Sequence, residues 1–177
     1  MKFAVALAAS IAVTSFALAQ SPYAGMETRP VKALSQNEVA DLTAGRGMGM
    51  ALAAELNGYP GPSHVLEFGD KLSLSVDQRA RIQRLFDTMK SEAIPLGQRL
   101  IAQESALDRQ FAGRTITPEN LKATTTEIGA IQAELRNTHL KYHLQTVEIL
   151  SPEQIKRYSS LRGYGSADPM QHHHHNQ

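Results

Sequence analysis

The sequence Leu-Ser-Val-Asp-Gln at residues 74–78 recurs as Leu-Ser-Pro-Glu-Gln at residues 150–154. In each copy a Ser stands where a helix can begin, and a Gln follows three residues later. This spacing is typical of a capping box, in which the Ser oxygen accepts from the third helical N–H and the Gln side chain accepts from the Ser N–H. In the second copy Pro152 takes the first helical position, where its missing donor has no cost. The repeat therefore predicts two helix starts, and its key residues are Leu74, Ser75, Gln78, Leu150, Ser151 and Gln154.

Two long helices are predicted from these signals. Ser75 begins the first and Gly113 ends it, and Pro95 inside it predicts a kink. Thr117, followed by Pro118 at the first helical position, begins the second. Because a short loop joins them, we expect an antiparallel hairpin. The expected fold class is all-α: a kinked antiparallel helical hairpin with short flanking helices, cradle-like and dimeric. The apolar residues of the second helix recur at intervals of seven: Leu121, Ile128, Leu135, Tyr142 and Ile149.

The N-terminus has the pattern of a secretory signal peptide. Lys2 supplies a positive charge, residues 3–18 are mostly apolar, and Ala-Leu-Ala at residues 17–19 matches a cleavage site. No later stretch approaches the roughly 20 apolar residues that a membrane span requires. We predict export of the chain, removal of residues 1–19 and no membrane span after processing.

Composition and the positions of Gly and Pro divide the rest of the chain into four segments. Residues 20–34 are predicted to be a flexible lead. Residues 35–71 are predicted to hold short helices separated by Gly/Met-rich and Pro/Gly turns, with a break where three glycines fall between residues 45 and 49. Residues 72–164 form the expected helical domain, and residues 165–177 form an expected disordered, His-rich tail.

Composition also excludes several classes of protein. The chain has no Cys, which excludes a disulfide framework, a thiol nucleophile and thiolate metal sites. Its 18 Lys and Arg against 17 Asp and Glu give no electrostatic attraction to nucleic acid. No nucleophile elbow, phosphate loop or His-Glu-x-x-His motif is present. We therefore predict that the protein is not an enzyme and does not bind nucleic acid.

Two histidines near the end of the second long helix are candidate metal ligands. His139 and His143 are four residues apart, so both imidazoles lie on one side of the helix. Such a pair is either half of a transition-metal site or a pair of polar boundary residues, and spacing alone leaves both open. Further ligands would come from elsewhere in the chain, and the candidates are His64, Glu67, Met48 and Met50.

Two other segments have a bearing on metal binding. Met48-Gly49-Met50 is either a thioether site for Cu(I) or core filler beside flexible glycines. The tail run is either a native metal buffer or a purification tag, and in both cases it binds nickel, copper or zinc weakly. Its histidines are His172, His173, His174 and His175.

The same end of the second long helix is apolar on two faces. Tyr142 lies on one face, whereas Leu140, Leu144 and Val147 lie about half a turn away. A hairpin of two helices covers only one face. The second face is therefore a client-binding or dimer face, or else the short terminal helices cover it.

The two Leu-Ser-x-x-Gln copies, the hairpin between them and the export signal resemble the LTxxQ family, over residues 72–164. That family includes Spy/CpxP-type periplasmic chaperones and related periplasmic heavy-metal sensors. Ser replaces the usual Thr in both copies and still caps a helix. The spacing of His139 and His143, just before the second copy, is similar to the ligand pair of the sensor branch.

The resemblance implies a periplasmic stress protein that binds a divalent transition metal, unfolded clients, or both, without ATP. The alternative is a purely ATP-independent holdase with no specific metal site. The implied metals are zinc, nickel or copper. The implied partners are unfolded periplasmic proteins or a signalling partner, together with a second copy of the chain in a homodimer.

Overall fold

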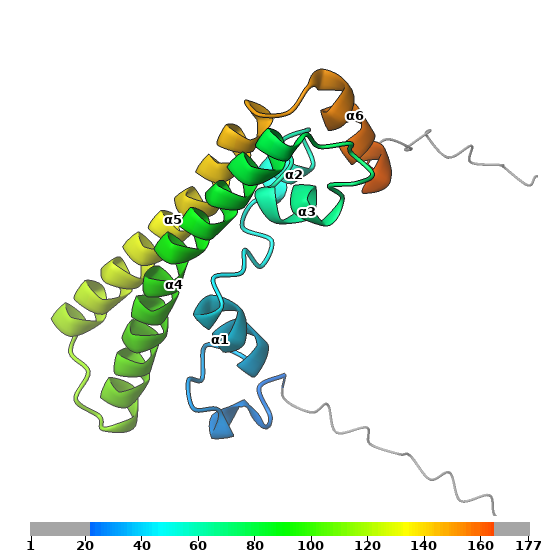
Figure 1. Ribbon diagram of the computed structural model, residues 1–177. Coiled ribbons are helices and arrows are strands. Elements are labelled where there is room, and N and C mark those ends of the chain that lie inside the picture. The colour runs from blue at the N-terminus through cyan, green and yellow to red at the C-terminus, as the bar shows by residue number, and fades with distance from the viewer. Residues whose placement is uncertain (1–21, 165–177) are drawn as a thin grey trace, which may run out of the picture.

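The computed structural model describes residues 22–164, and every regular element in that part of the chain is helical (Figure 1). The predicted all-α fold is confirmed. The predicted signal peptide and His-rich tail lie outside the described residues. The elements are the 3-10 helix η1 (Met26–Thr28) and the helices α1 (Gln36–Thr43), α2 (Leu52–Glu55), α3 (Pro62–Glu67), α4 (Val76–Ala112), α5 (Pro118–Val147) and α6 (Pro152–Leu161).

The helix starts follow from local chemistry. Ser75 begins α4 and Ser151 begins α6, and each makes a complete capping box with the Gln three residues later. Ser35 makes a third box with Glu38 at the start of α1. Thr117 caps α5 by accepting from the N–H of Asn120 at 3.2 Å. Each cap satisfies a backbone N–H that the first helical turn leaves without a partner.

Helices α4 and α5 form the predicted antiparallel hairpin, seen as the two long green and yellow helices of Figure 1. Helix α4 runs through Pro95 as one continuous helix. A proline removes one hydrogen bond to the carbonyl four residues earlier. Pro95 is exposed, so the ring lies on the solvent side of α4 and not in the hairpin core.

The glycine run breaks the N-terminal helix as predicted. Helix α1 ends at Thr43, and turns fill the chain until α2 begins at Leu52. Helix α1 packs on α4 where α4 carries Gly97. A Cβ at Gly97 would lie 2.4 Å from the carbonyl oxygen of Leu42, so only glycine permits this approach.

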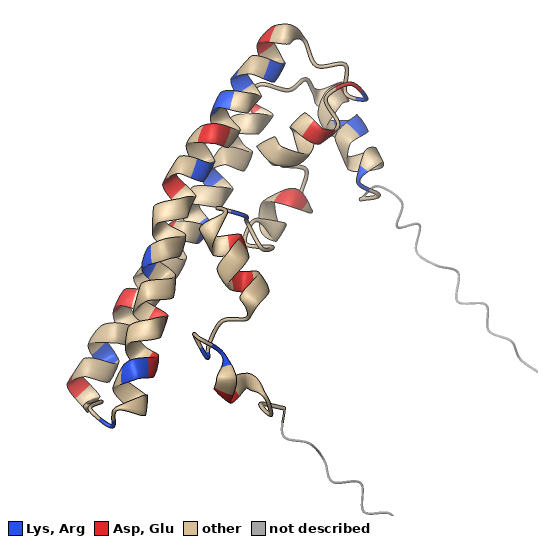
Figure 2. Cartoon of the chain, turned by 60° about the horizontal axis from the view of Figure 1, so that its bottom comes forward, with Lys and Arg blue, Asp and Glu red and all other residues tan. Residues whose placement is uncertain are grey.

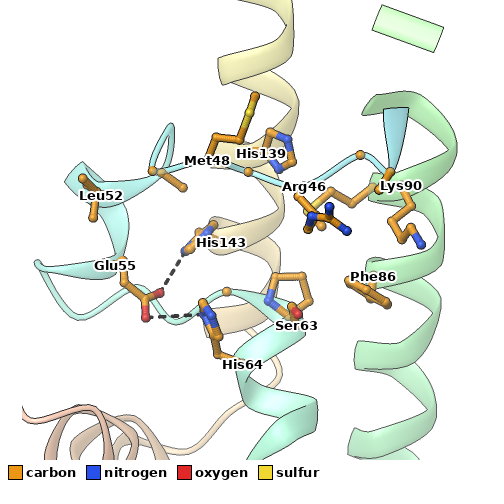
Figure 3. Close-up of a pocket in the computed structure, with 18 of the residues that line it drawn as sticks. Arg46, Met48, Leu52, Glu55, Ser63, His64, Phe86, Lys90, His139 and His143 are labelled. Carbon is orange, nitrogen blue, oxygen red and sulfur yellow. Dashed lines mark ion pairs between the residues drawn. The ribbon is translucent and has the colours of Figure 1, made fainter. Parts of the chain in front are cut away.

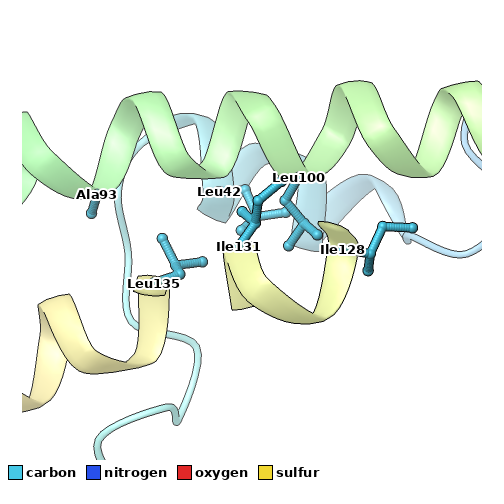
Figure 4. Packing of buried hydrophobic residues seen from close by; sticks show 6 residues of the cluster. All are labelled: Leu42, Ala93, Leu100, Ile128, Ile131 and Leu135. Atoms are coloured by element: carbon cyan, nitrogen blue, oxygen red, sulfur yellow. The ribbon is translucent and has the colours of Figure 1, made fainter. Parts of the chain in front are cut away.

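Two apolar clusters hold the molecule together. The first joins α1, α4 and α5 along the middle of the hairpin (Figure 4), and the second joins α3, α4 and α6 at the end where both Leu-Ser-x-x-Gln copies lie. Residues 22–34 add turns, η1 and one buried residue, Val31. The buried members of the first cluster are Leu42, Ala93, Leu100, Ile128, Ile131 and Leu135, and those of the second are Val65, Leu72, Ile82, Leu150 and Tyr158.

Charged residues of both signs are interspersed along the hairpin, without a broad surface of one sign in the view of Figure 2. Within residues 22–164, none of the helices combines the length and apolar character needed to cross a membrane.

Candidate functional site

The two Leu-Ser-x-x-Gln copies meet in space through their glutamines. Gln78 Nε2 donates to Gln154 Oε1 at 2.9 Å, and Gln154 Nε2 donates to Gln78 Oε1 at 3.0 Å. Each amide also donates to a backbone carbonyl, Gln78 to Ile149 at 2.9 Å and Gln154 to Leu72 at 3.2 Å. The pair therefore ties the start of α4 to the start of α6.

Each glutamine side-chain oxygen also accepts a second hydrogen bond, from the backbone N–H of the capping serine. Gln78 Oε1 accepts from the N–H of Ser75 at 3.1 Å, and Gln154 Oε1 accepts from the N–H of Ser151 at 2.9 Å. Both amides thus donate two hydrogen bonds and accept two within the protein. The sequence predicted the caps, but not the bridge, because nothing in the local pattern says that the two helix starts adjoin. The motif is structural in this chain, and the functional site must be sought elsewhere.

A cleft of about 640 Å³ lies between the hairpin and the segment that runs from the end of α1 to α3. Both predicted histidines on α5 line it, together with His64 from α3 and Phe86 and Met89 from α4. Figure 3 shows α2 and the glycine-rich turns lying over the α5 side of this cleft. We refer to it below as the histidine cleft.

His139 is buried in the histidine cleft without a hydrogen-bond partner for Nε2. Its side chain is only 3% exposed. On the opposite side of the ring, Nδ1 lies 3.4 Å from the position that a Cβ at Gly47 would take. Burial, and secondly the charge of His143, lower the pKa of His139 below its usual value. Burial therefore favours the neutral imidazole, in which one ring nitrogen carries a lone pair.

His143 is held in a fixed orientation. Its Nδ1 lies 2.6 Å from the carbonyl oxygen of Tyr59. Because a carbonyl only accepts, Nδ1 carries the proton, and in the neutral ring Nε2 carries the lone pair. The ring packs so closely on Gly61 that a Cβ there would lie 2.8 Å from Nε2.

Glu55 is the residue of the cleft that sequence reasoning missed. It is 7% exposed and accepts hydrogen bonds from the hydroxyls of Tyr158 and Tyr164. Arg162 lies 3.2 Å away and balances its charge. Its carboxylate also lies 3.7 Å from Nδ1 of His64. Glu55 therefore joins α2 to the C-terminal helix and to α3.

Glu55 also approaches the α5 histidines. Its Oε2 is 3.8 Å from Nδ1 of His143, one of the two dashed pairs in Figure 3, and has no hydrogen-bond partner. Two buried polar atoms without a hydrogen-bond partner, Glu55 Oε2 and His139 Nε2, thus line one cleft. A buried polar atom without a protein partner requires an explanation, and a bound water or ion is one that would satisfy it.

The other predicted ligands are placed differently. His64 lines the histidine cleft, whereas Glu67 is exposed on α3 and does not line it. Met48 lines the cleft, but Met50 packs against the first apolar cluster. Within residues 22–164, no group of three or more His, Asp or Glu side chains is arranged to hold a metal ion. The tail histidines at residues 172–175 lie outside the described part of the chain.

The second apolar face of α5 is partly exposed in the described structure. Leu144 is 56% exposed, and Leu140 and Val147 are partly exposed. The first face is buried, with Ile128, Leu135 and Tyr142 packed inside. Leu144 is therefore uncovered in the described residues, whereas Leu140 and Val147 are partly covered. We call Leu140, Leu144 and Val147 the exposed α5 face.

An all-helical hairpin in which two copies of one capping motif lock together defines the structural class of the protein. The model of the LTXXQ motif family protein matches residues 64–162, more than half of the chain. The chain belongs to the LTXXQ motif family, and the resemblance is confirmed. This family is typically periplasmic and consists of non-enzymatic stress and sensor proteins, which fits a Spy/CpxP-like role in general. No curated protein and no solved structure matches the chain.

Proposed function

We propose that this protein is a periplasmic holdase that binds apolar segments of unfolded proteins on the exposed α5 face without ATP. The observation that carries the proposal is the 56% exposure of Leu144 on a long, well-packed helix. Burying one leucine side chain is worth about 1.5–3 kcal/mol. A face of three such residues can therefore hold a client weakly and release it without an energy source.

The rest of the fold supports this use of the face. The opposite side of α5 packs on α4, and the glutamine bridge fixes the end of the hairpin that bears Leu144. The face is thus presented by a rigid support, which limits the entropy lost when a client binds. A homodimer formed through the same face is the competing use of these residues.

The test is suppression of aggregation of a chemically unfolded client by the purified chain in the absence of nucleotide. Leu144→Asp places a charge in the face and should weaken suppression by roughly 10-fold or more, the loss expected from one buried leucine. Leu121→Asp is the matched control, because Leu121 is an exposed leucine at the other end of the same helix. Equal suppression by the two variants, with unchanged helix content, would contradict the proposal.

A second candidate function is transition-metal binding by His139 and His143. The observation that favours it is the buried, unpartnered Nε2 of His139 beside a His143 ring whose orientation the carbonyl of Tyr59 fixes. A hydrogen bond to the far ring nitrogen is the usual support of a metal-binding imidazole.

Calorimetric titration with zinc, nickel and copper tests this second function. Every sample should carry the tail changes His172–His175→Asn, because the tail would otherwise bind metal itself. His143→Ala should lower the affinity, and an unchanged affinity would refute the site.

A further inference from the structure

The histidine cleft contains methionine sulfur as well as imidazole nitrogen. Met48 and Met89 both line it together with His139. Figure 3 draws Met48 beside the ring of His139. Met48 comes from the glycine-rich turns, Met89 from α4 and His139 from α5, so three separate elements bring these side chains to one cleft.

The backbone at Met48 is in the left-handed region, with φ of +45°. This region disfavours any residue with a Cβ, and glycine adopts it without that penalty. Glycine occupies both neighbouring positions, 47 and 49, yet a methionine stands between them. Ser73 and Arg114 share this conformation in turns of their own, and Met48 differs from them because it lines the histidine cleft.

Met48 is also not explained by packing. The residue is 36% exposed, whereas Met50, two residues later, is packed against the first apolar cluster. The structure thus separates the two methionines that the sequence treated as a pair. Met50 is core filler, and Met48 is free to contact a ligand in the cleft.

The donor set decides the class of metal. Zinc sites are built from His, Cys, Asp and Glu and are almost always four-coordinate. The described residues offer no cluster of three or more such side chains that would suit an ion. Thioether sulfur is a soft donor that selects Cu(I), and imidazole also suits copper. One buried imidazole nitrogen and two thioethers therefore match a cuprous ion better than a divalent one.

We propose that the histidine cleft binds one cuprous ion through Nε2 of His139 and the sulfur atoms of Met48 and Met89. This inference rests on the second proposed function: it keeps His139 as a ligand, places Met48 and Met89 beside it in place of His143, and names the metal class. It is independent of the holdase function. In this proposal the turn at Met48 holds the thioether sulfur next to the buried imidazole of His139. The site takes up the ion without a change in its oxidation state.

The experiment is an anaerobic titration of the full chain with Cu(I) against a chromophoric Cu(I) chelator, with His172–His175→Asn in every sample. Met48→Leu removes the sulfur, keeps the shape and should weaken Cu(I) binding roughly 10- to 100-fold. Met50→Leu is the matched control and should change the affinity by less than about twofold, because a volume-conserving core swap leaves the cleft intact. X-ray absorption of the Cu(I) sample should show weaker sulfur scattering in Met48→Leu, where Met89 remains, and unchanged sulfur scattering in Met50→Leu.

A third variant separates binding from folding. Met48→Gly should raise the melting temperature, because it relieves the left-handed strain, and should still weaken Cu(I) binding. A variant that is more stable but binds less cannot have lost binding by unfolding.

Equal effects of Met48→Leu and Met50→Leu, or the absence of any Cu(I) binding beyond the chelator, would overturn the proposal. Tight zinc binding that His143→Ala weakens, together with Cu(I) binding that Met48→Leu leaves unchanged, would also overturn it, while supporting transition-metal binding by His139 and His143. Aggregation suppression is measured separately, so failure of the copper site leaves the holdase function to its own test.

Discussion

The glutamine bridge predicts that Gln78→Glu destabilises the protein, although Glu is an accepted residue at the third position of a capping box. The introduced carboxylate would still accept from the N–H of Ser75. Its second oxygen would take the place of Gln78 Nε2, which now donates to Ile149 O and to Gln154 Oε1, both at 2.9 Å. A carboxylate would therefore face two acceptors in a partly buried position.

The expected change in the free energy of unfolding of Gln78→Glu follows from the hydrogen bonds that are lost. Two hydrogen bonds are worth roughly 1 kcal/mol each, and leaving their acceptors unpaired adds to the loss. The negative charge near the start of α4 returns about 0.3–1 kcal/mol through the helix dipole. We expect a net loss of about 2–3 kcal/mol in the free energy of unfolding at pH 7.

The loss of unfolding free energy in Gln78→Glu, called the deficit below, should depend on pH. Because it faces two acceptors, the introduced carboxyl would have a higher pKa in the folded than in the unfolded chain, where it is about 4.3. The protonated acid is then favoured by folding, so the deficit is full above the folded pKa and shrinks as pH falls toward about 4.

Urea unfolding at about pH 7 and about pH 4 measures this effect. Glu38→Gln is the matched control, because Glu38 closes the capping box of α1 and bridges no second helix. It should lower the free energy of unfolding by at most about 1 kcal/mol at pH 7, the helix-dipole contribution of the lost charge. If Gln78→Glu cost no more than this control, the amide donors would have no structural role and the reasoning would be refuted.

Two further predictions concern packing and alkaline stability. Gly97→Ala should cost about 1–3 kcal/mol in urea unfolding, because the added Cβ would lie 2.4 Å from the Leu42 carbonyl oxygen and α1 must shift; a neutral result would refute the close contact. Burial and the hydrogen bond to Glu92 raise the pKa of Tyr142 from its ordinary value of 10 to about 12. The stabilisation is present below about pH 10 and lost as pH rises toward about 12. Tyr142→Phe should therefore flatten the fall in unfolding free energy over that range, and an unchanged slope would contradict the assignment.

The helix starts could be predicted from sequence because capping is local. Ser75, Thr117 and Ser151 each begin a helix where the pattern placed one. The antiparallel hairpin followed from apolar periodicity and a short loop. The family resemblance rested on the same local motif, and the family match confirmed it.

The tertiary features could not be predicted in this way. The bridge from Gln78 to Gln154 and the burial of Glu55 both depend on which helix ends adjoin, which no local spacing records. The pairing of Met48 with Met50 was an interpretation from adjacency alone, and a turn in the left-handed region directs the two side chains to different surroundings.

Client binding on the exposed α5 face is the central claim, and methyl NMR of the chain with an unfolded client tests it most directly. Addition of the client should shift or broaden the methyl signals of Leu140, Leu144 and Val147 and leave those of Leu121, at the far end of the helix, unchanged. Unchanged signals from Leu140, Leu144 and Val147, or perturbation confined to Leu121, would contradict the account.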